Sequence, residues 1–317
     1  MGAALWRGRA MAQTAALMPP PGTEGWARRA AETRAQSLAA LPFERVETTG
    51  REALATWKRL RAAGRGWPVV IGGDEELDRV AEQYSIAVER PKVRGVETPP
   101  VPDMTPAAIL ARAAKLAHPA GLKALRVQEE RQAEQIEREQ RAKGGNTLPL
   151  MADLGADGKL RQLSQAEVRE RMAQAPTEPA VGDWPSNVAA GDTGLTLAKD
   201  VHGQPLDKVH ILLIPTTESA AVPAYLRWGG WNACPAPEYH VAALRSWHER
   251  YGAELVAIGG DVLNLRVTRR PQSRDEALAL AREMYVYDED IVSQGTETFA
   301  VLGATLMASD WWFFWWD

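Results

Sequence analysis

The chain ends in six consecutive aromatic residues, Trp311 to Trp316, followed by Asp317. Burying one such ring removes roughly 150–250 Å² from water, which is worth about 4–6 kcal/mol at about 25 cal/mol per Å². A frayed and solvated tail cannot hold six rings at that free-energy cost. We therefore expect residues 311–316 to form a strand that packs into the core of this protein or against a partner.

Length, charge and cysteine usage favour a folded protein. The chain has 317 residues, enough for one large or two smaller domains, and 25% of them are charged, as in ordinary globular proteins. A formal net charge of −4 gives no general attraction to nucleic acid or to anionic lipid. The lone cysteine, Cys234, excludes an internal disulfide and fits a reducing compartment.

Targeting signals are weak in this chain. No apolar run approaches the roughly 20 residues that cross a bilayer. The N-terminus makes a poor signal peptide, because Gln13 and Thr14 interrupt its short apolar stretch and prolines follow. Met11 is as suitable a start as Met1. We therefore expect a cytoplasmic protein with neither a nucleic-acid partner nor a membrane partner.

Changes in composition divide the chain into four regions. We predict a flexible N-terminus at 1–23, a helical and α/β region at 24–117, a charged helix with an irregular insertion at 118–207, and a C-terminal α/β domain at 208–317. Within the second region, the patterns indicate helices at 24–40, 51–64, 74–84 and 105–117, and a buried strand at 67–71. The N-terminal part is therefore mostly helical.

The third region begins with a highly charged segment, residues 122–143. Pairs such as Glu134 with Arg138 stabilise a helix at i,i+4 spacing, but the apolar stripe is thin, which predicts a solvated helix that projects from the body. A hairpin is expected around Asp157-Gly158. A short helix is expected after Ser164, which forms a capping box with Glu167.

The C-terminal region alternates strands and helices. Strands are predicted at 209–214, 254–258, 263–267 and from 311, and helices at 237–251, 273–284 and 296–307. This order predicts a mixed sheet flanked by helices, an α/β fold of the α+β kind.

Several spaced segments of this region resemble a known bacterial family. They are KVHILLIPT, AYLRWGGWN, LRSWHERYGAELVAIGGDVLNLRVTR, RPQSRDEALALAREMYVYDEDIVSQG and the terminal WWFFWWD. In order and spacing they are similar to the uncharacterised domain-of-unknown-function family 4253. The resemblance implies a domain boundary near 208 and an α/β fold, and it implies no activity. This chain has Asp288-Glu289 where similar proteins often carry Cys-Pro, which argues against a thiol-based role at that place.

The loop Trp228-Gly229-Gly230-Trp231-Asn232 is the most suggestive candidate for binding. Two glycines permit positive φ or close backbone approach, and two indoles would form a stacking wall for a ligand or peptide. The alternative interpretation is that both rings cover the edge of the core, which is the usual fate of tryptophan.

Cysteine and histidine offer two further possibilities. Cys234 with His240 or His248 would form a thiol–imidazole pair, although we favour an inert cysteine because no protease or transferase signature surrounds it. The two histidines lie eight residues apart on one predicted helix, too far for an i,i+4 metal chelate. We therefore predict neither a metal nor a cofactor.

An acidic cluster follows the predicted helix at 273–284. It contains Glu283, Asp288, Glu289 and Asp290, and Asp317 is expected to approach it. Buried carboxylates of this kind do acid–base work or bind a hard cation, whereas a hydrated loop is the simpler interpretation.

A second motif, Ile71-Gly72-Gly73, lacks the lysine and the glycine spacing of a phosphate loop, and three acidic residues follow it. We therefore predict no phosphate site there.

The absence of a coherent catalytic set in the sequence favours a non-catalytic binding or interaction protein, of an immunity or regulatory kind, with a protein partner. The residues that we predict to bind are Trp228, Gly229, Gly230, Trp231, Asn232, His240, Asp290, Trp315, Trp316 and Asp317. One alternative is a hydrolase or transferase in which Asp290, Asp317 and His240 converge in a pocket. A second alternative is a structural or assembly component that uses the charged helix as its contact.

Overall fold

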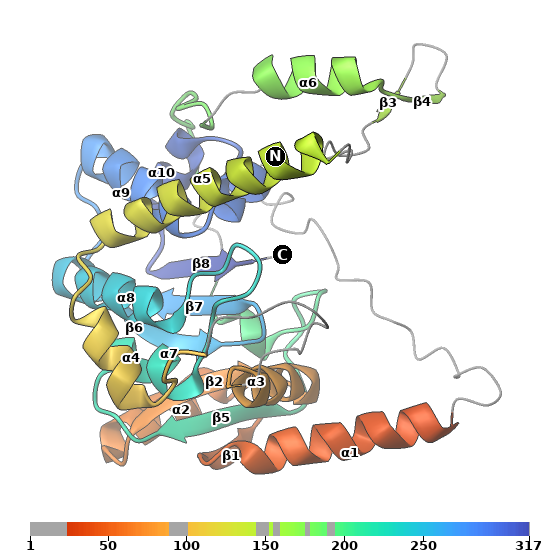
Figure 1. The fold of residues 1–317 in the computed structure, drawn as a ribbon. Coiled ribbons are helices and arrows are strands. Elements are labelled where there is room, and N and C mark those ends of the chain that lie inside the picture. Colours follow the sequence, from red (N-terminus) through yellow and green to blue (C-terminus); the bar gives the residue numbers. More distant parts are fainter. Residues whose placement is uncertain are drawn as a thin grey trace.

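A mixed sheet of six strands forms the centre of the molecule in the computed structural model, which describes residues 24–88, 101–143, 152–154, 159–174, 178–188 and 194–316 (Figure 1). Its strands are β1 (Glu44–Thr48), β2 (Trp67–Gly72), β5 (Val209–Ile214), β6 (Glu254–Ile258), β7 (Val262–Arg266) and β8 (Trp311–Trp315). A separate hairpin pairs β3 (Ala152–Leu154) with β4 (Leu160–Gln162). The mixed sheet confirms the predicted α+β class.

The strand order β1-β5-β2-β6-β7-β8 interleaves distant parts of the sequence. Strand β5 pairs antiparallel with β1 on one side and with β2 on the other, and β2 then pairs in parallel with β6. The antiparallel pairs β6–β7 and β7–β8 complete the sheet. The sheet therefore runs across the predicted boundary at 208, and the division into four regions remains a prediction.

The central strands are the most apolar segments of the chain. Both β2 and β5 are buried along their whole length, as expected for strands that have a neighbour on each side and helices over the sheet. The apolar run at 209–214 predicted β5 with the observed bounds, and the prediction at 254–258 likewise matches β6. Burial on both faces explains why β2 and β5 do not alternate polar with apolar residues.

Helices surround the sheet (Figure 1). They are α1 (Glu24–Ala40), α2 (Ala53–Ala63), α3 (Asp74–Ile86), α4 (Pro106–Ala113), α5 (Ala120–Ala142), α6 (Gln165–Gln174), α7 (Val222–Leu226), α8 (Pro237–Tyr251), α9 (Arg274–Tyr287) and α10 (Phe299–Ala308). A π-helical turn, Ile291–Thr296, precedes α10. The observed helix therefore begins at Phe299, three residues after the predicted start at 296. Among the described residues, no helix is both long and apolar enough to span a membrane.

The aromatic C-terminus forms the edge strand β8, as the sequence predicted. Trp312, Phe314 and Trp316 are buried, while the alternate residues of the strand are half-buried. The Phe314 ring stacks on Trp247 of α8 with centroids 5.4 Å apart and planes 4° from parallel. The tail is therefore part of the core. Its side chains alternate between buried and half-buried, so the face that carries Trp312, Phe314 and Trp316 points inward.

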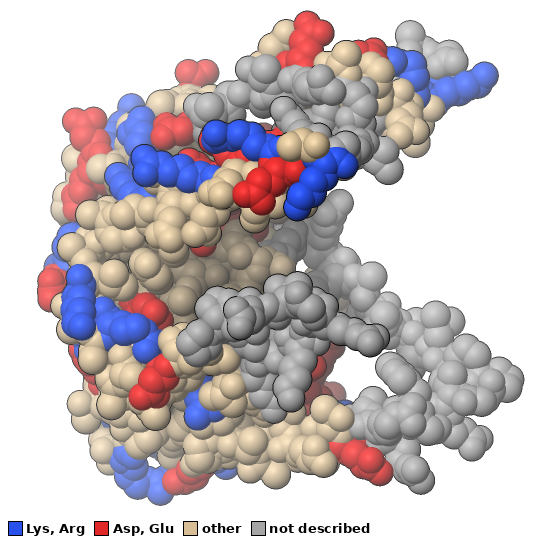
Figure 2. Space-filling view, viewed as in Figure 1, with Lys and Arg blue, Asp and Glu red and all other residues tan. Residues whose placement is uncertain are grey.

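Within the described residues, the first part of the charged helix α5 packs against the body. Leu122 is buried, and the Arg126 guanidinium donates to the carbonyl oxygen of Ala233 at 2.7 Å, whereas nearly all the described side chains from Val127 to Lys143 are exposed. Basic and acidic side chains are mixed along this helix, without a patch of one sign, on the face shown in Figure 2. The predicted ion pair of Glu134 and Arg138 forms at 2.8 Å.

The insertion is described only in part. Residues 155–158, which hold the predicted hairpin turn, lie outside the described residues, and so do 1–23 and 89–100. The strands on either side of that turn pair antiparallel. Ser164 and Glu167 form the predicted capping box, because the Glu167 carboxylate accepts from the Ser164 main-chain N–H at 2.8 Å and the Ser164 hydroxyl accepts in return from the Glu167 N–H.

Candidate functional site at the Trp228–Asn232 loop

The loop between α7 and α8 has an unusual backbone. Four of its residues have positive φ: Arg227 at 53°, Gly229 at 110°, Gly230 at 89° and Asn232 at 45°. Such conformations cost of order 1–3 kcal/mol for a residue other than glycine, so they persist only where the surroundings impose them. The Gly230 N–H donates to the carbonyl oxygens of Cys234 and Pro235, which closes the loop on itself.

Trp228 and Gly229 fix this loop to the core. The Trp228 side chain is 1% exposed, and its indole N–H donates to the Gly259 carbonyl oxygen at 2.7 Å. A Cβ atom on Gly229 would lie 2.2 Å from the Pro235 carbonyl oxygen and 2.7 Å from Nε2 of His240. Only glycine fits at position 229, whereas at Gly230 the positive φ rather than the space favours glycine.

Several of the predicted binding residues meet in one aromatic cluster. The Trp228 ring lies 5.0 Å from Trp231, 4.8 Å from His240 and 5.5 Å from Trp316, between ring centroids. His240 and Trp316 are themselves 5.5 Å apart. Trp231 is half-buried, and Gly230 and Asn232 are exposed, so only the tip of the loop reaches solvent.

The imidazole of His240 lies at the centre of this cluster. Its Nδ1 is 2.5 Å from the Tyr287 hydroxyl oxygen, and its Nε2 is 3.4 Å from Sγ of Cys234. Complete burial lowers the pKa of His240 to about 3, and burial also raises the pKa of the Cys234 thiol. Cys234 and His240 are therefore in contact, but as a neutral pair, which is the opposite of the thiolate–imidazolium pair that a nucleophilic cysteine needs.

His248 does not join this cluster. It is exposed near the end of α8, and its Nδ1 lies 3.0 Å from the Ala253 carbonyl oxygen. Among the residues that the structure describes, no group of three His, Cys, Asp or Glu side chains is placed to hold a metal ion.

The acidic residues are dispersed rather than gathered. Asp290 begins the π-helical turn, where its carboxylate accepts from the Gln294 amide at 2.6 Å, and the described residues show no contact between Asp290 and His240. Asp317 lies outside the described residues. Glu289 is exposed, whereas Asp288 is buried and accepts from the main-chain N–H of Trp315 at 3.0 Å.

Glu283 is buried as the centre of a separate network. Its carboxylate accepts from the Trp247 indole N–H, contacts His118 and forms an ion pair with Arg250. Burial alone would raise the pKa of Glu283, but its bonds to His118 and Arg250 outweigh burial and lower the pKa to about 2. The sequence had favoured a hydrated loop for Glu283. Nothing in the residues around Glu283 indicated that its carboxylate is buried on a helix and paired with a cation, because Arg250 and His118 come from distant segments.

A repeated tetrapeptide, which was not recognised in the sequence, lies beside the loop. Ile-Gly-Gly-Asp occurs at 71–74 and again at 258–261, and each copy ends one strand of the parallel pair β2–β6. Glu76 accepts from the Gly260 N–H at 2.6 Å, and Arg79 pairs with Asp261 at 2.6 Å. The carboxyl ends of parallel strands are a common place for ligands in open sheets, and Trp228 contacts this edge through Gly259.

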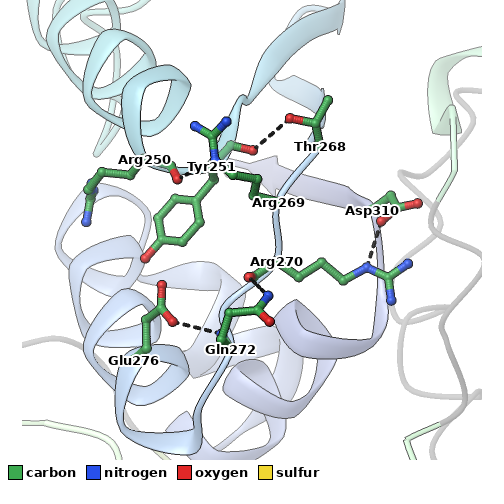
Figure 3. Close-up of a pocket in the computed structure, with 8 residues that line it drawn as sticks. All are labelled: Arg250, Tyr251, Thr268, Arg269, Arg270, Gln272, Glu276 and Asp310. Atoms are coloured by element: carbon green, nitrogen blue, oxygen red, sulfur yellow. Dashed lines mark hydrogen bonds and ion pairs between the residues drawn. The ribbon is translucent and has the colours of Figure 1, made fainter.

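An open pocket of about 510 Å³ lies at the other end of α8 (Figure 3). Three arginines line it, and protein groups already engage each of them. Arg250 pairs with Glu283, Arg269 donates to main-chain carbonyl oxygens at the end of α8, and Arg270 pairs with Asp310 at 2.6 Å. In Figure 3 the three guanidinium groups also point in different directions, so they do not converge on one anion.

Comparison with known proteins identifies one domain in the C-terminal third of the chain and no activity. Residues 210–317 match the model of a family described as a domain of unknown function (DUF4253), in agreement with the motifs found in the sequence. The match begins inside β5 and includes the Trp228–Asn232 loop and the aromatic terminus. No curated protein and no solved structure matches the chain.

Proposed function

We propose that this protein is a non-catalytic binding module that holds a protein partner at the tip of the Trp228–Asn232 loop. The observation that carries the proposal is the strained backbone of that loop. Arg227 and Asn232 both have positive φ without being glycine, and such strain is concentrated at binding and catalytic sites. A loop held in one conformation loses little entropy when a partner binds.

The exposed tip has the composition of a protein contact. Trp231 packs edge-on against the buried Trp228 and keeps part of its ring accessible, with the exposed Asn232 beside it. Tryptophan is enriched among the residues that dominate binding energy, and an anchored ring loses little rotamer freedom. Arg126 from α5 donates to Ala233 behind the tip, which connects the loop to the charged helix.

The chemistry around His240 supports binding rather than catalysis. The neutral imidazole, the thiol and the Tyr287 hydroxyl bond to one another, and burial raises the pKa of Tyr287 as well as that of Cys234. These groups are therefore poor proton carriers near neutral pH and act as a rigid floor beneath the loop.

The test compares Trp231 at the tip with an exposed apolar side chain elsewhere on the surface. Affinity purification from lysate of the source cells, quantified by mass spectrometry, should enrich a protein with the wild-type chain, and Trp231→Ala should reduce that enrichment by at least about tenfold. Ile136→Ala removes another exposed apolar side chain, on α5, and should leave the enrichment unchanged. Equal loss in both variants, or retention in Trp231→Ala, would contradict the proposal.

Asn232→Gly refines the assignment. Glycine adopts positive φ without strain, so this variant should keep the conformation of the loop while removing the amide side chain. A melting temperature equal to or above that of the wild type, together with weaker binding, would place Asn232 in the contact. Unchanged binding would limit the contact to Trp231.

A further inference from the structure

The sheet ends in an open edge at β1. Strand β1 pairs only with β5, and the described residues include none that hydrogen-bonds to the main chain on its other side. Glu44, Arg45 and Glu47 are exposed, and Val46 is half-buried. An unpaired strand edge of this kind is a template for pairing with another strand.

The five residues of β1 are complementary to themselves. If two copies pair antiparallel about a two-fold axis at Val46, Arg45 of each copy lies opposite Glu47 of the other, and Glu44 lies opposite Thr48. Opposite charges placed directly across an antiparallel pair stabilise it, and like charges weaken it. A shift of one residue along the strand would lose this match. We propose that β1 pairs with β1 of a second copy, so that two sheets join into one continuous sheet.

The charged groups needed for this pairing are accessible. Among the described residues, Arg45 has no ion-pair partner, and the Glu47 side chain is 57% exposed, with only a 3.8 Å contact to His210. Both side chains lie on the face of the sheet that carries α1 and α3, because Arg45 pairs in register with Leu212 and lines a groove with Leu77 of α3.

A groove beside β1 supplies further contact area. It has a volume of about 310 Å³ and is lined by Leu38, Leu41, Phe43, Arg45, Leu77 and Leu212. A two-fold axis perpendicular to the sheet keeps each face on its own side, so the grooves and α1 helices of both copies would meet across that axis. Residues 31–36 of α1 are all exposed in the single chain. A stable interface buries about 1,200–2,000 Å² in total, which a five-residue strand pair alone does not reach.

The occupant is a second copy rather than another protein because the match is symmetric. A self-complementary patch is the requirement for a two-fold dimer, in which each residue makes the same contact twice. The charges on the strand would select this register and disfavour the shifted registers that lead to aggregation. The inference is independent of the Trp231 tip, which lies toward the opposite end of the sheet.

A charge swap tests the proposal. Light scattering during size exclusion should give twice the chain mass of 34.7 kDa. Either Arg45→Glu or Glu47→Arg alone places like charges in opposition and should weaken dimerisation by at least about tenfold. The double variant Arg45→Glu/Glu47→Arg restores the complementarity and should return the dimer. Circular dichroism would establish that the single variants, which change exposed side chains, remain folded.

A cross-link tests the register itself. Val46→Cys places two thiols on the axis, where they should form a disulfide between copies under mild oxidation, whereas Glu44→Cys should not because residue 44 faces residue 48. The native Cys234 is buried and does not compete. A monomer at all concentrations between about 1 and 100 µM, a dimer unaffected by the single swaps, or a double variant that stays monomeric would each overturn the proposal.

Discussion

The two edges of the sheet are protected in different ways. At β8 the edge is aromatic, and the buried Asp288 carboxyl accepts the outward N–H of Trp315, while the Ser309 hydroxyl accepts that of Trp311. At β1 the edge is charged and exposed, and in the described part of the chain no side chain caps its backbone. One edge is closed by the chain's own groups, and the other is left open to solvent or to a second copy.

This difference follows the sequence of each strand. Six aromatic residues would be insoluble at an open edge, so β8 must be covered, whereas Glu44, Arg45 and Glu47 make β1 soluble without a cover. Stability is therefore concentrated at the β8 side, and the β1 side is free to carry an interaction. The following variants test that division.

Truncation after Ser309 should have the largest effect. It removes β8 with the buried Trp312, Phe314 and Trp316. Together these rings are worth about 12–18 kcal/mol gross, which matches or exceeds the net stability of about 5–15 kcal/mol typical of a protein. The truncated chain should aggregate on expression. Trp311→Thr, at a half-buried position, serves as the control and should fold. A soluble truncation with an unchanged melting temperature would show that the tail serves a partner instead.

Asp288→Ala should have the next largest effect. The substitution leaves the main-chain N–H groups of Trp315 and Asp290 without their acceptor, 3.0 and 3.1 Å away, in a buried place. We expect a loss of about 2–4 kcal/mol in the free energy of unfolding, measured by urea titration. Asn keeps one acceptor oxygen, so Asp288→Asn should cost clearly less. Equal stability of Asp288→Ala and wild type would show that the edge closes without this carboxyl.

Glu283, which supports Trp247 beside β8, should make the free energy of unfolding sensitive to acid. Its pKa falls from 4.5 to about 2 on folding, so its contribution is complete above pH 4.5 and is lost as the pH drops through about 2. At about 1.4 kcal/mol per pKa unit, the shift corresponds to about 3 kcal/mol. Glu283→Gln should flatten the dependence of the unfolding free energy on pH over this window. A variant as acid-sensitive as the wild type would assign the transition to other carboxylates.

Arg65→Gln should have the smallest effect. Arg65 pairs with Glu44 of β1 at 3.3 Å, and both side chains are more than half exposed. An exposed pair of this kind contributes about 0–1 kcal/mol, which salt reduces further. The melting temperature in thermal denaturation should therefore change little. A large drop in the melting temperature would show that ion pairs hold β1 in place, and it would contradict the view that stability is concentrated at the β8 edge.

Much of the secondary structure could be predicted from the sequence. The apolar runs at 209–214 and 254–258 match β5 and β6, Ser273 caps α9 as its spacing with Glu276 predicts, and the aromatic tail is a strand. These signals are local, because the hydrophobic period and the cap lie within a few residues of one another.

The candidate site was only partly predictable. The Trp228–Asn232 loop stood out for its residues, but the neutral state of His240 and the burial of Asp288 and Glu283 had no signature in the surrounding sequence. A pKa depends on desolvation and on partners brought from distant segments, such as Tyr287 beside His240. The repeated Ile-Gly-Gly-Asp was visible in the sequence and became meaningful only when its two copies lay side by side.

The sequence by itself determined most of the helices and strands, although not β1 or α7, and it indicated that the aromatic terminus must be covered and that its last 108 residues resemble one family. Only the tertiary structure decided that β5 lies between β1 and β2, and that one edge is closed while the other is open. The reason is physical. Local periodicity sets the shape of each element, whereas strand order and burial depend on contacts between residues far apart in the chain.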